Sequence, residues 1–313
     1  MANGTIVVVG SSNTDMIVKV PRIPKPGESV MGGRFTMAAG GKGANQAVAA
    51  ARAGGQVSLI ARVGNDVFGE EAVQGYARDG IDVGCVTRED GAPTGIALIF
   101  VGENGQNSIA VAPGANSSLT PEHIEKFRDR ILEADTLLMQ LETPLETVQA
   151  AAEIAAGAGK RIILNPAPGR QLPDDLLRQI SILTPNESEA EILTGIRFED
   201  DMSAGRAAER LLDRGVGIVI VTLGERGAYA ASGKERRRLP GFQVKAVDAT
   251  AAGDVFNGAL AVGLSEGMAL QDAVRFAHAA AALSVTKLGA QPSIPYRHQV
   301  DQFLEKHAQT PSA

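Results

Sequence analysis

One aspartate stands among small residues at the start of an apolar stretch, where acid–base chemistry is possible. Residues 248–254 read Asp-Ala-Thr-Ala-Ala-Gly-Asp, and an apolar run with helical character follows at 255–260. The first turn of a helix leaves backbone N–H groups without partners, and its dipole favours negative charge. Asp254 is therefore placed to take a proton from a hydroxyl beside a phosphate. The alternative is an aspartate favoured there by the dipole alone.

A glycine-rich segment, Gly40-Gly41-Lys42-Gly43-Ala44-Asn45-Gln46, precedes a second helical run. Glycines allow close backbone approach and positive φ. Lys42 and Asn45 are three residues apart, so they share a helix face. The segment is not a Walker A loop, which needs Gly-Lys-Ser/Thr after a four-residue spacer. Paired polar groups beside glycines suit a polyhydroxyl ligand better.

Three further polar side chains follow predicted strands. Asn13 and Asp15 are two apart in extended chain and would point the same way. An amide and a carboxylate there can accept from and donate to sugar hydroxyls, although an Asx turn is the alternative. Glu142 would be another hydroxyl acceptor, or only a loop carboxylate.

Two later loops have the composition of a nucleotide site. Asn186 and Glu189 could organise phosphates and a hydrated magnesium ion, or simply form a capping box at a helix start. Thr222, Gly224 and Gly227 could admit phosphates, or form a tight turn. His278 lies in an apolar helical run, where a packed core residue is the ordinary interpretation. No zinc-ligand spacing and no Gly-x-Ser-x-Gly elbow is present.

Composition limits the class of protein. The chain has 313 residues, 44% hydrophobic and 21% charged, with a formal net charge of -6. An acidic balance argues against a nucleic-acid partner. The single cysteine, Cys85, suits a reducing cytosol, and no run of about 20 apolar residues is present to span a membrane. We therefore expect a cytoplasmic protein without a membrane partner.

Short β-branched runs alternate with alanine-rich helical segments. The strands are expected at 6–9, 57–60, 136–139, 161–164, 180–183 and 218–221, and the helices at 43–53, 69–78, 122–132, 145–158, 187–194 and 203–214. This alternation predicts an α/β fold, a doubly wound and mainly parallel sheet flanked by helices. Ligands of such sheets bind beyond the carboxyl ends of the strands, where the polar motifs fall.

Residues 14–39 and 94–112 break the alternation and predict a small β-sheet lid. The main domain would comprise 1–13, 40–93 and 113–305, followed by a polar tail at 306–313. Residues 96–101 are consecutively apolar, whereas a strand open to water on one face should alternate. One face would then cover a ligand and the other a second subunit. The alternative is a strand packed on its own domain.

Taken in order, these segments resemble the ribokinase-like carbohydrate kinases over nearly the whole chain. The matching motifs are residues 10–15, 40–46, 165–168, 184–187, 222–224 and 251–254. The Asn13/Asp15 pair, residues 41–46 and residues 289–293 look like the members that phosphorylate D-ribose.

The resemblance implies ATP-dependent phosphorylation of D-ribose at O5, by a homodimer joined through its lid. Asp254 would be the base, and the N–H groups of Ala251, Ala252 and Gly253 would form the anion hole. The sugar would be held by Asn13, Asp15, Gly41, Lys42, Asn45 and Glu142. ATP would be held by Asn186, Thr222, Gly224, Gly227, Gly253 and His278, with Glu189 tied to Mg²⁺. A K⁺ ion would be held largely by carbonyls at Asp248, Thr250, Ser284, Lys287, Gly289 and Ser293.

One position departs from the pattern: the family usually carries Thr where this chain has Ala249. The lost hydroxyl adjoins the potassium loop, and carbonyl ligation would make the change mild. Two other functions are weighed, a kinase of another pentose or nucleoside, such as 2-deoxyribose or adenosine, and a non-catalytic sugar-binding protein.

Overall fold

A nine-stranded sheet forms the centre of the computed structural model, which describes residues 4–103, 106–200, 202–233 and 235–308. Its strands are β1 (Thr5–Val9), β4 (Gln56–Gly64), β5 (Val86–Glu89), β8 (Thr136–Met139), β9 (Arg161–Leu164), β10 (Ile182–Leu183), β11 (Ile218–Thr222), β12 (Ala228–Ser232) and β13 (Glu235–Leu239). The spatial order is β13-β12-β11-β10-β9-β8-β1-β4-β5. The strands from β11 to β5 are parallel, and β12 and β13 add an antiparallel edge.

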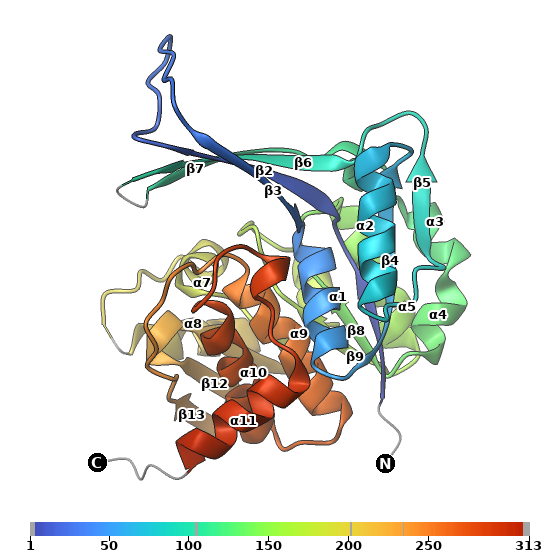
Figure 1. Cartoon of the computed structure of the whole chain (residues 1–313). Coiled ribbons are helices and arrows are strands. Elements are labelled where there is room, and N and C mark those ends of the chain that lie inside the picture. Colours follow the sequence, from blue (N-terminus) through green and yellow to red (C-terminus); the bar gives the residue numbers. More distant parts are fainter. Residues whose placement is uncertain (1–3, 104–105, 201, 234, 309–313) are drawn as a thin grey trace.

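Helices cover both faces of this sheet (Figure 1). Ile6 and Val8 of β1 belong to one apolar core, and Val7 and Val9 belong to the other, because successive strand residues point to opposite faces. The first face carries α1 (Lys42–Arg52), α2 (Val67–Arg78), α9 (Ala252–Ser265), α10 (Leu270–Ser284) and α11 (Arg297–Ala308). The second carries α3 (Pro121–Lys126), α4 (Arg128–Glu133), α5 (Leu145–Gly157), α6 (Asp174–Leu177), α7 (Glu187–Thr194) and α8 (Ser203–Asp213). The predicted doubly wound fold is confirmed.

Three expected elements differ from the structure. The strand expected at 180–183 is shorter and comprises only Ile182–Leu183 (β10). It does not extend to Ser181, because Ile162 N donates to the Ser181 hydroxyl instead of to a backbone carbonyl. The helix expected at 122–132 is broken at Phe127, which leaves helical geometry and packs against the core. Helix α11 continues to residue 308, so the polar tail does not begin at 306, and residues 309–313 lie outside the described chain. Strand β5 and helix α6 were not expected.

A second sheet of four strands projects from the main body (Figure 1). It consists of β2 (Asn13–Val20), β3 (Arg34–Gly40), β6 (Gly95–Gly102) and β7 (Asn107–Ala112), in the order β3-β2-β6-β7. The small sheet expected from residues 14–39 and 94–112 is therefore present. Residues 104–105, between β6 and β7, lie outside the described residues.

The strand order decides where side chains converge. Strand β1 lies between β4 and β8, so the chain leaves β1 in one direction and later returns on its other side. Such a switch point opens a crevice beyond the carboxyl ends of the strands. The loops after β1, β8 and β9, together with the starts of α1 and α9, meet in this region. Among the described helices, none is both long and apolar enough to cross a membrane.

The start of α1 packs directly against the loop after β1. A Cβ atom added to Gly43 would lie 2.5 Å from Gly10 C and from Ser11 N, both of them backbone atoms that cannot rotate away. The bond from Ala44 N to Ser11 O, 2.8 Å long, holds the two segments at this separation. Glycine at 43 is therefore required by close approach, and the contact fixes α1 relative to β1.

We expect Gly43→Ala to destabilise the fold by about 1–3 kcal/mol, because the added methyl must displace backbone. The matched control is Gly75→Ala in α2, where the new Cβ meets only the flexible Arg78 side chain at 3.8 Å. This control should gain about 0.5–1 kcal/mol, because alanine lowers the entropy of the unfolded chain. Urea unfolding of both variants measures the difference, and equal effects would contradict the packing argument.

Candidate active site

Asp254 lies in the first turn of α9 and is 5% exposed. The residue before the helix, Ala251, has φ 60, the one positive φ of a non-glycine residue in the described ranges. This left-handed turn directs the chain into α9. A Cβ atom added to Gly253 would meet no atom within 4 Å, so space remains beside the helix start. Ala252 N donates to Ala249 O at 3.2 Å and is thus partly engaged within the turn.

Two amides hold the Asp254 carboxylate. Asn45 Nδ2 donates to Asp254 Oδ2, and Gln46 Nε2 donates to Asp254 Oδ1, each at 3.0 Å. Burial raises the pKa of Asp254, while Lys42 and these two hydrogen bonds oppose the rise. The buried Asn45 Oδ1 has no partner among the described atoms, so that amide can still accept a hydrogen bond. The arrangement is an oriented carboxylate beside an open space.

The residues expected to hold a sugar come together near this carboxylate. Asn13 and Asp15 both lie in β2, not in an Asx turn, and both are buried. Asn116 Nδ2 donates to Asn13 Oδ1 at 2.8 Å. Glu142 Oε2 accepts from Lys42 N at 2.9 Å and from Ser11 Oγ at 2.5 Å. Gly41, with φ 88, forms the turn into α1.

Four carboxylates surround the ammonium group of Lys42. Burial by itself would lower the pKa of Lys42, but attraction to Asp254, Glu142, Glu189 and Asp15 raises it overall. Burial, together with repulsion from Glu142 and Asp254, raises the pKa of Asp15 to about 7. The excess of negative groups leaves this site ready for hydroxyl donors and a cation.

The loops after β10 and β11 lie side by side, joined by a bridge between Asn186 and Thr222. Asn186 and Glu189 form the expected capping box, with Glu189 N donating to Asn186 Oδ1 at 2.8 Å and Asn186 N donating to Glu189 Oε2 at 2.9 Å. Burial raises the pKa of Glu189. Gly224 and Gly227 bound a turn with positive φ at both positions.

His278 is a packed residue of α10. Its ring lies 5.0 Å from that of Phe256, and burial lowers its pKa to about 4, so the ring is neutral near pH 7. Its Nε2 has no hydrogen-bond partner among the described residues. No hydrogen bond among the described residues joins its Nε2 to Asn186 or Thr222, so the structure does not link it directly to those loops.

The segment around Asp248 is tied to the loop after α10. Asp248 Oδ1 accepts from Thr250 N and Oγ1, and Asp248 Oδ2 accepts from Gly289 N at 2.8 Å. Ser284 ends α10, its carbonyl accepts from Lys287 N, and Ser293 lies in the short helix η3 (Gln291–Ser293). The six predicted cation positions thus fall in two connected loops. In the part of the chain that the structure describes, no group of three or more His, Cys, Asp or Glu side chains could hold a metal ion.

Sequence reasoning missed several buried amides that support the site. Gln46 was noticed only as part of its motif, yet it contacts Asp254. Asn165 and Gln140, which directly follow β9 and β8, both bond to Gln46. Their positions at strand ends were the available signal. Asn116, in the short helix η1 (Gly114–Ser118), has no motif that could have identified it.

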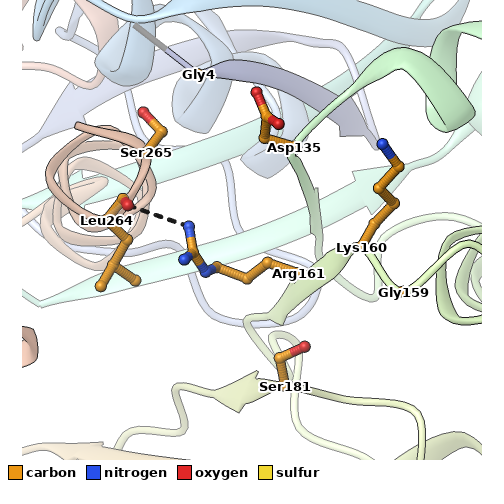
Figure 2. A pocket seen from close by; sticks show the side chains of 8 residues that line it. All are labelled: Gly4, Asp135, Gly159, Lys160, Arg161, Ser181, Leu264 and Ser265. Carbon is orange, nitrogen blue, oxygen red and sulfur yellow. Dashed lines mark hydrogen bonds between the residues drawn. The ribbon is translucent and has the colours of Figure 1, made fainter. Parts of the chain in front are cut away.

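A separate hollow of about 540 Å³ lies at the other end of the sheet, near the starts of β1, β8 and β9 (Figure 2). Gly4, Asp135, Lys160 and Arg161 line part of it. The Arg161 guanidinium is occupied, because its Nη1 donates to Leu264 O at 3.1 Å. None of the predicted site residues reaches this hollow.

A comparison with known protein families agrees with the geometry of this site. The sequence model of the pfkB family carbohydrate kinases matches residues 3–297. The chain belongs to this family. The carboxylate in the first turn of α9, facing sugar-type polar groups, is thus the candidate centre of a carbohydrate kinase.

Individual relatives within this family resemble the chain over nearly its whole length. The ribokinase of Haemophilus influenzae is 46% identical over 301 residues, covering 96% of this chain and 98% of that protein. The deoxyribokinase of Salmonella typhi is 37% identical over 300 residues, covering 96% and 98%. The ribokinase of Arabidopsis thaliana, solved with ribose and ATP, is 34% identical with a TM-score of 0.92, covering 97% of this chain and 99% of that one.

The raised pKa of Asp15 predicts a pH-dependent cost to stability. Between about pH 4 and pH 7 the folded kinase keeps a proton that the unfolded chain releases, so stability from this group falls as pH rises. Asp15→Asn cannot ionise. We therefore expect this variant to gain about 1–3 kcal/mol over the parent between pH 5 and pH 8, with the gain levelling off above pH 7.

Denaturant unfolding at four pH values measures the gain. The exposed Asp213→Asn in α8 is the matched control for replacing an aspartate by asparagine. A stability difference between Asp15→Asn and the parent that does not change with pH would show that Asp15 is not ionised at a cost.

Proposed function

We propose that this kinase transfers the γ-phosphoryl group of ATP to O5 of D-ribose. The observation that carries the proposal is the buried Asp254 carboxylate, oriented by Asn45 and Gln46 beside an open helix start. Asp15 and Glu142 face the same space, as their interactions with Lys42 and Asp254 indicate. The ribokinase relatives and the neighbour with bound ribose and ATP support the choice of substrates.

In the proposed reaction, Asp254 takes the proton of the ribose hydroxyl as its oxygen attacks the γ-phosphorus. The new O–P bond forms while the bond to the β,γ-bridging oxygen breaks, and ADP leaves with that electron pair. The N–H groups of Ala251 and Gly253, with that of Ala252 once it turns from Ala249 O, would stabilise the charge on the transferring group. Asn13, Asp15, Gly41, Lys42, Asn45 and Glu142 would position the sugar.

The nucleotide would lie along the loops after β10 and β11, with Asn186, Thr222, Gly224, Gly227, Gly253 and His278 in contact with it. Asn186 and Thr222 are supported as contacts because they lie side by side. His278 is supported because its Nε2 has no hydrogen-bond partner among the described residues. A magnesium ion near Glu189 would neutralise phosphate charge, with the carboxylate acting through water because both its oxygens accept from Asn186.

A potassium ion would sit in the loops that Asp248 joins. The oxygen-rich donor set fits it: carbonyls of Asp248, Thr250, Ser284, Lys287, Gly289 and Ser293, in loops fixed by the Asp248 carboxylate. Ala249 contributes no hydroxyl, so ligation by carbonyls should keep activation by potassium. Cys85, free and buried, is in keeping with a cytoplasmic location.

We also propose that the small sheet is a lid that joins two subunits. In register, Met37, Met16 and Leu98 form one row across it, and Phe35, Val18 and Phe100 form the next, all on one face. Phe35, Met37, Leu98 and Phe100 are 36–55% exposed in the single chain. These exposures do not support the alternative in which β6 packs on its own domain. A second copy would cover this face, while Asp15 lies on the opposite, ligand-facing side.

A kinase of 2-deoxyribose is the second candidate, since the Salmonella typhi deoxyribokinase is also similar. An ATP-coupled assay with ribose, 2-deoxyribose, other pentoses and adenosine, with potassium or sodium, separates the candidates. Highest kcat/KM on ribose in potassium is the expected result. Preference for another acceptor would overturn the substrate, and binding without turnover would favour a non-catalytic sugar-binding protein.

Asp254→Asn and Asp254→Ala should each lower kcat by about 10²–10⁴-fold, because the hydroxyl loses its base. Ribose should still bind, since the other sugar contacts remain. The coupled assay measures kcat, and calorimetry measures ribose binding. Near-normal turnover by either variant would rule out Asp254 as the base.

Leu98→Glu should weaken the dimer at least about tenfold, because a charge would be buried without a partner between the two lids. Sedimentation over a range of protein concentrations measures the equilibrium. The control is Val67→Glu, another exposed apolar residue, which lies in α2 outside the small sheet. Equal behaviour of the two variants would place the interface elsewhere.

A further inference from the structure

A chain of three buried amides ends on the carboxylate of Asp254. Gln46 Nε2 donates to Asp254 Oδ1 at 3.0 Å and to Asn165 Oδ1 at 3.1 Å. Gln140 Nε2 donates to Gln46 Oε1 at 2.7 Å. Gln46 is fully buried and Gln140 nearly so, with exposures of 0% and 1%. Gln46 therefore has no surface through which to touch a ligand, and any effect it has on catalysis passes through Asp254.

The direction of the Gln46 amide is set by its neighbours. Asn165 Nδ2 donates to the backbone carbonyl of Thr184 at 3.1 Å, and a carbonyl can only accept. The side-chain oxygen of Asn165 must then face Gln46, and the Gln46 NH₂ group donates a hydrogen bond to it. From the other side, Gln140 donates to the Gln46 oxygen. A reversed Gln46 amide would set oxygen against Asp254 and Asn165, and NH₂ against NH₂.

The space that the three amides occupy depends on Gly10. A Cβ atom at Gly10 would lie 2.2 Å from Gln140 Oε1, so a larger residue would push Gln140 away from Gln46. The amides come from α1 and from the loops after β8 and β9, while Asp254 comes from α9. These hydrogen-bonded amides thus join the strand ends of the central sheet to the start of α9.

We propose that Gln46 is a positioning residue that fixes the rotation of the Asp254 carboxylate, and that Asn165 and Gln140 fix Gln46 in turn. This inference rests on the proposed function of Asp254 as the base. With Oδ1 held by Gln46, the carboxylate presents Oδ2 to the hydroxyl that loses its proton, and Oδ2 also accepts from Asn45 Nδ2. A donor to the carboxylate also keeps it ionised before the reaction.

The test compares Gln46→Met, which keeps the length but cannot donate, with Gln140→Met, which removes only the outer support. Thr147→Val is the control, because it removes a fully buried hydrogen bond, to Leu119 O, that lies in α5 and has no contact with Asp254. For each variant, the coupled assay gives kcat and KM for ribose from pH 5 to pH 9, and thermal unfolding gives stability.

Gln46→Met should lower kcat at pH 7 about tenfold or more and move the ascending limb of its pH profile up by about one to two pH units. KM for ribose should change less than about threefold, because the sugar contacts remain. Gln140→Met should move the limb in the same direction by less. Thr147→Val should lose stability and leave the limb in place.

An unmoved limb in Gln46→Met, or a loss of kcat matched by a similar rise in KM, would overturn the positioning role. If Gln46→Met does not fold, the limb of Gln140→Met decides, and no shift there would overturn the amide chain. Failure of the proposed function gives another result: Asp254→Asn would keep its turnover, or the unaltered chain would not phosphorylate ribose.

Discussion

The burial of a carboxylate at the start of α9 is the constraint around which the rest of the site is arranged. Removing Asp254 from water raises its pKa and disfavours the charged form that a base requires. Lys42 and two amides offset this cost. Each of these groups comes from α1, so the packing of α1 against α9 brings the proposed base and its supports together.

That packing follows from the fold. Strand β1 lies at the switch point of the sheet, and α1 returns across it after the two strands of the small sheet. Gly10 and Gly43 let the loop after β1 and the start of α1 touch through backbone alone. A further glycine, Gly258, brings α9 equally close to α1, since a Cβ there would lie 2.6 Å from Gln46 O. Polar side chains at the strand ends then face one space without any element crossing it.

Much of this could be predicted from sequence, and the reasons are local. Short β-branched runs and alanine-rich segments predict the layers, and a polar residue after a strand, such as Asn13 or Glu142, marks the ligand end. The break at Phe127 and the short β10 could not be predicted, because each depends on a tertiary contact. The roles of the Asn116, Gln140 and Asn165 amides could not be predicted for the same reason, although Asn165 lies in a motif noted in the sequence. Their bonds to Ser12 and Gln46 join residues that are 94 to 119 positions apart in the chain.

Asn186 and Glu189 stabilise the fold whether or not a nucleotide is present, because their capping box supplies hydrogen-bond partners to backbone N–H groups at the start of α7. A descendant that lost catalysis would therefore still retain this pair for helix stability. Asp254 is the opposite case, since burial disfavours its charge and its side chain caps no helix. With Asp254 as the proposed base, its loss in a relative would be the informative sign of lost activity, whereas survival of the Asn186/Glu189 pair would not be evidence that activity persists.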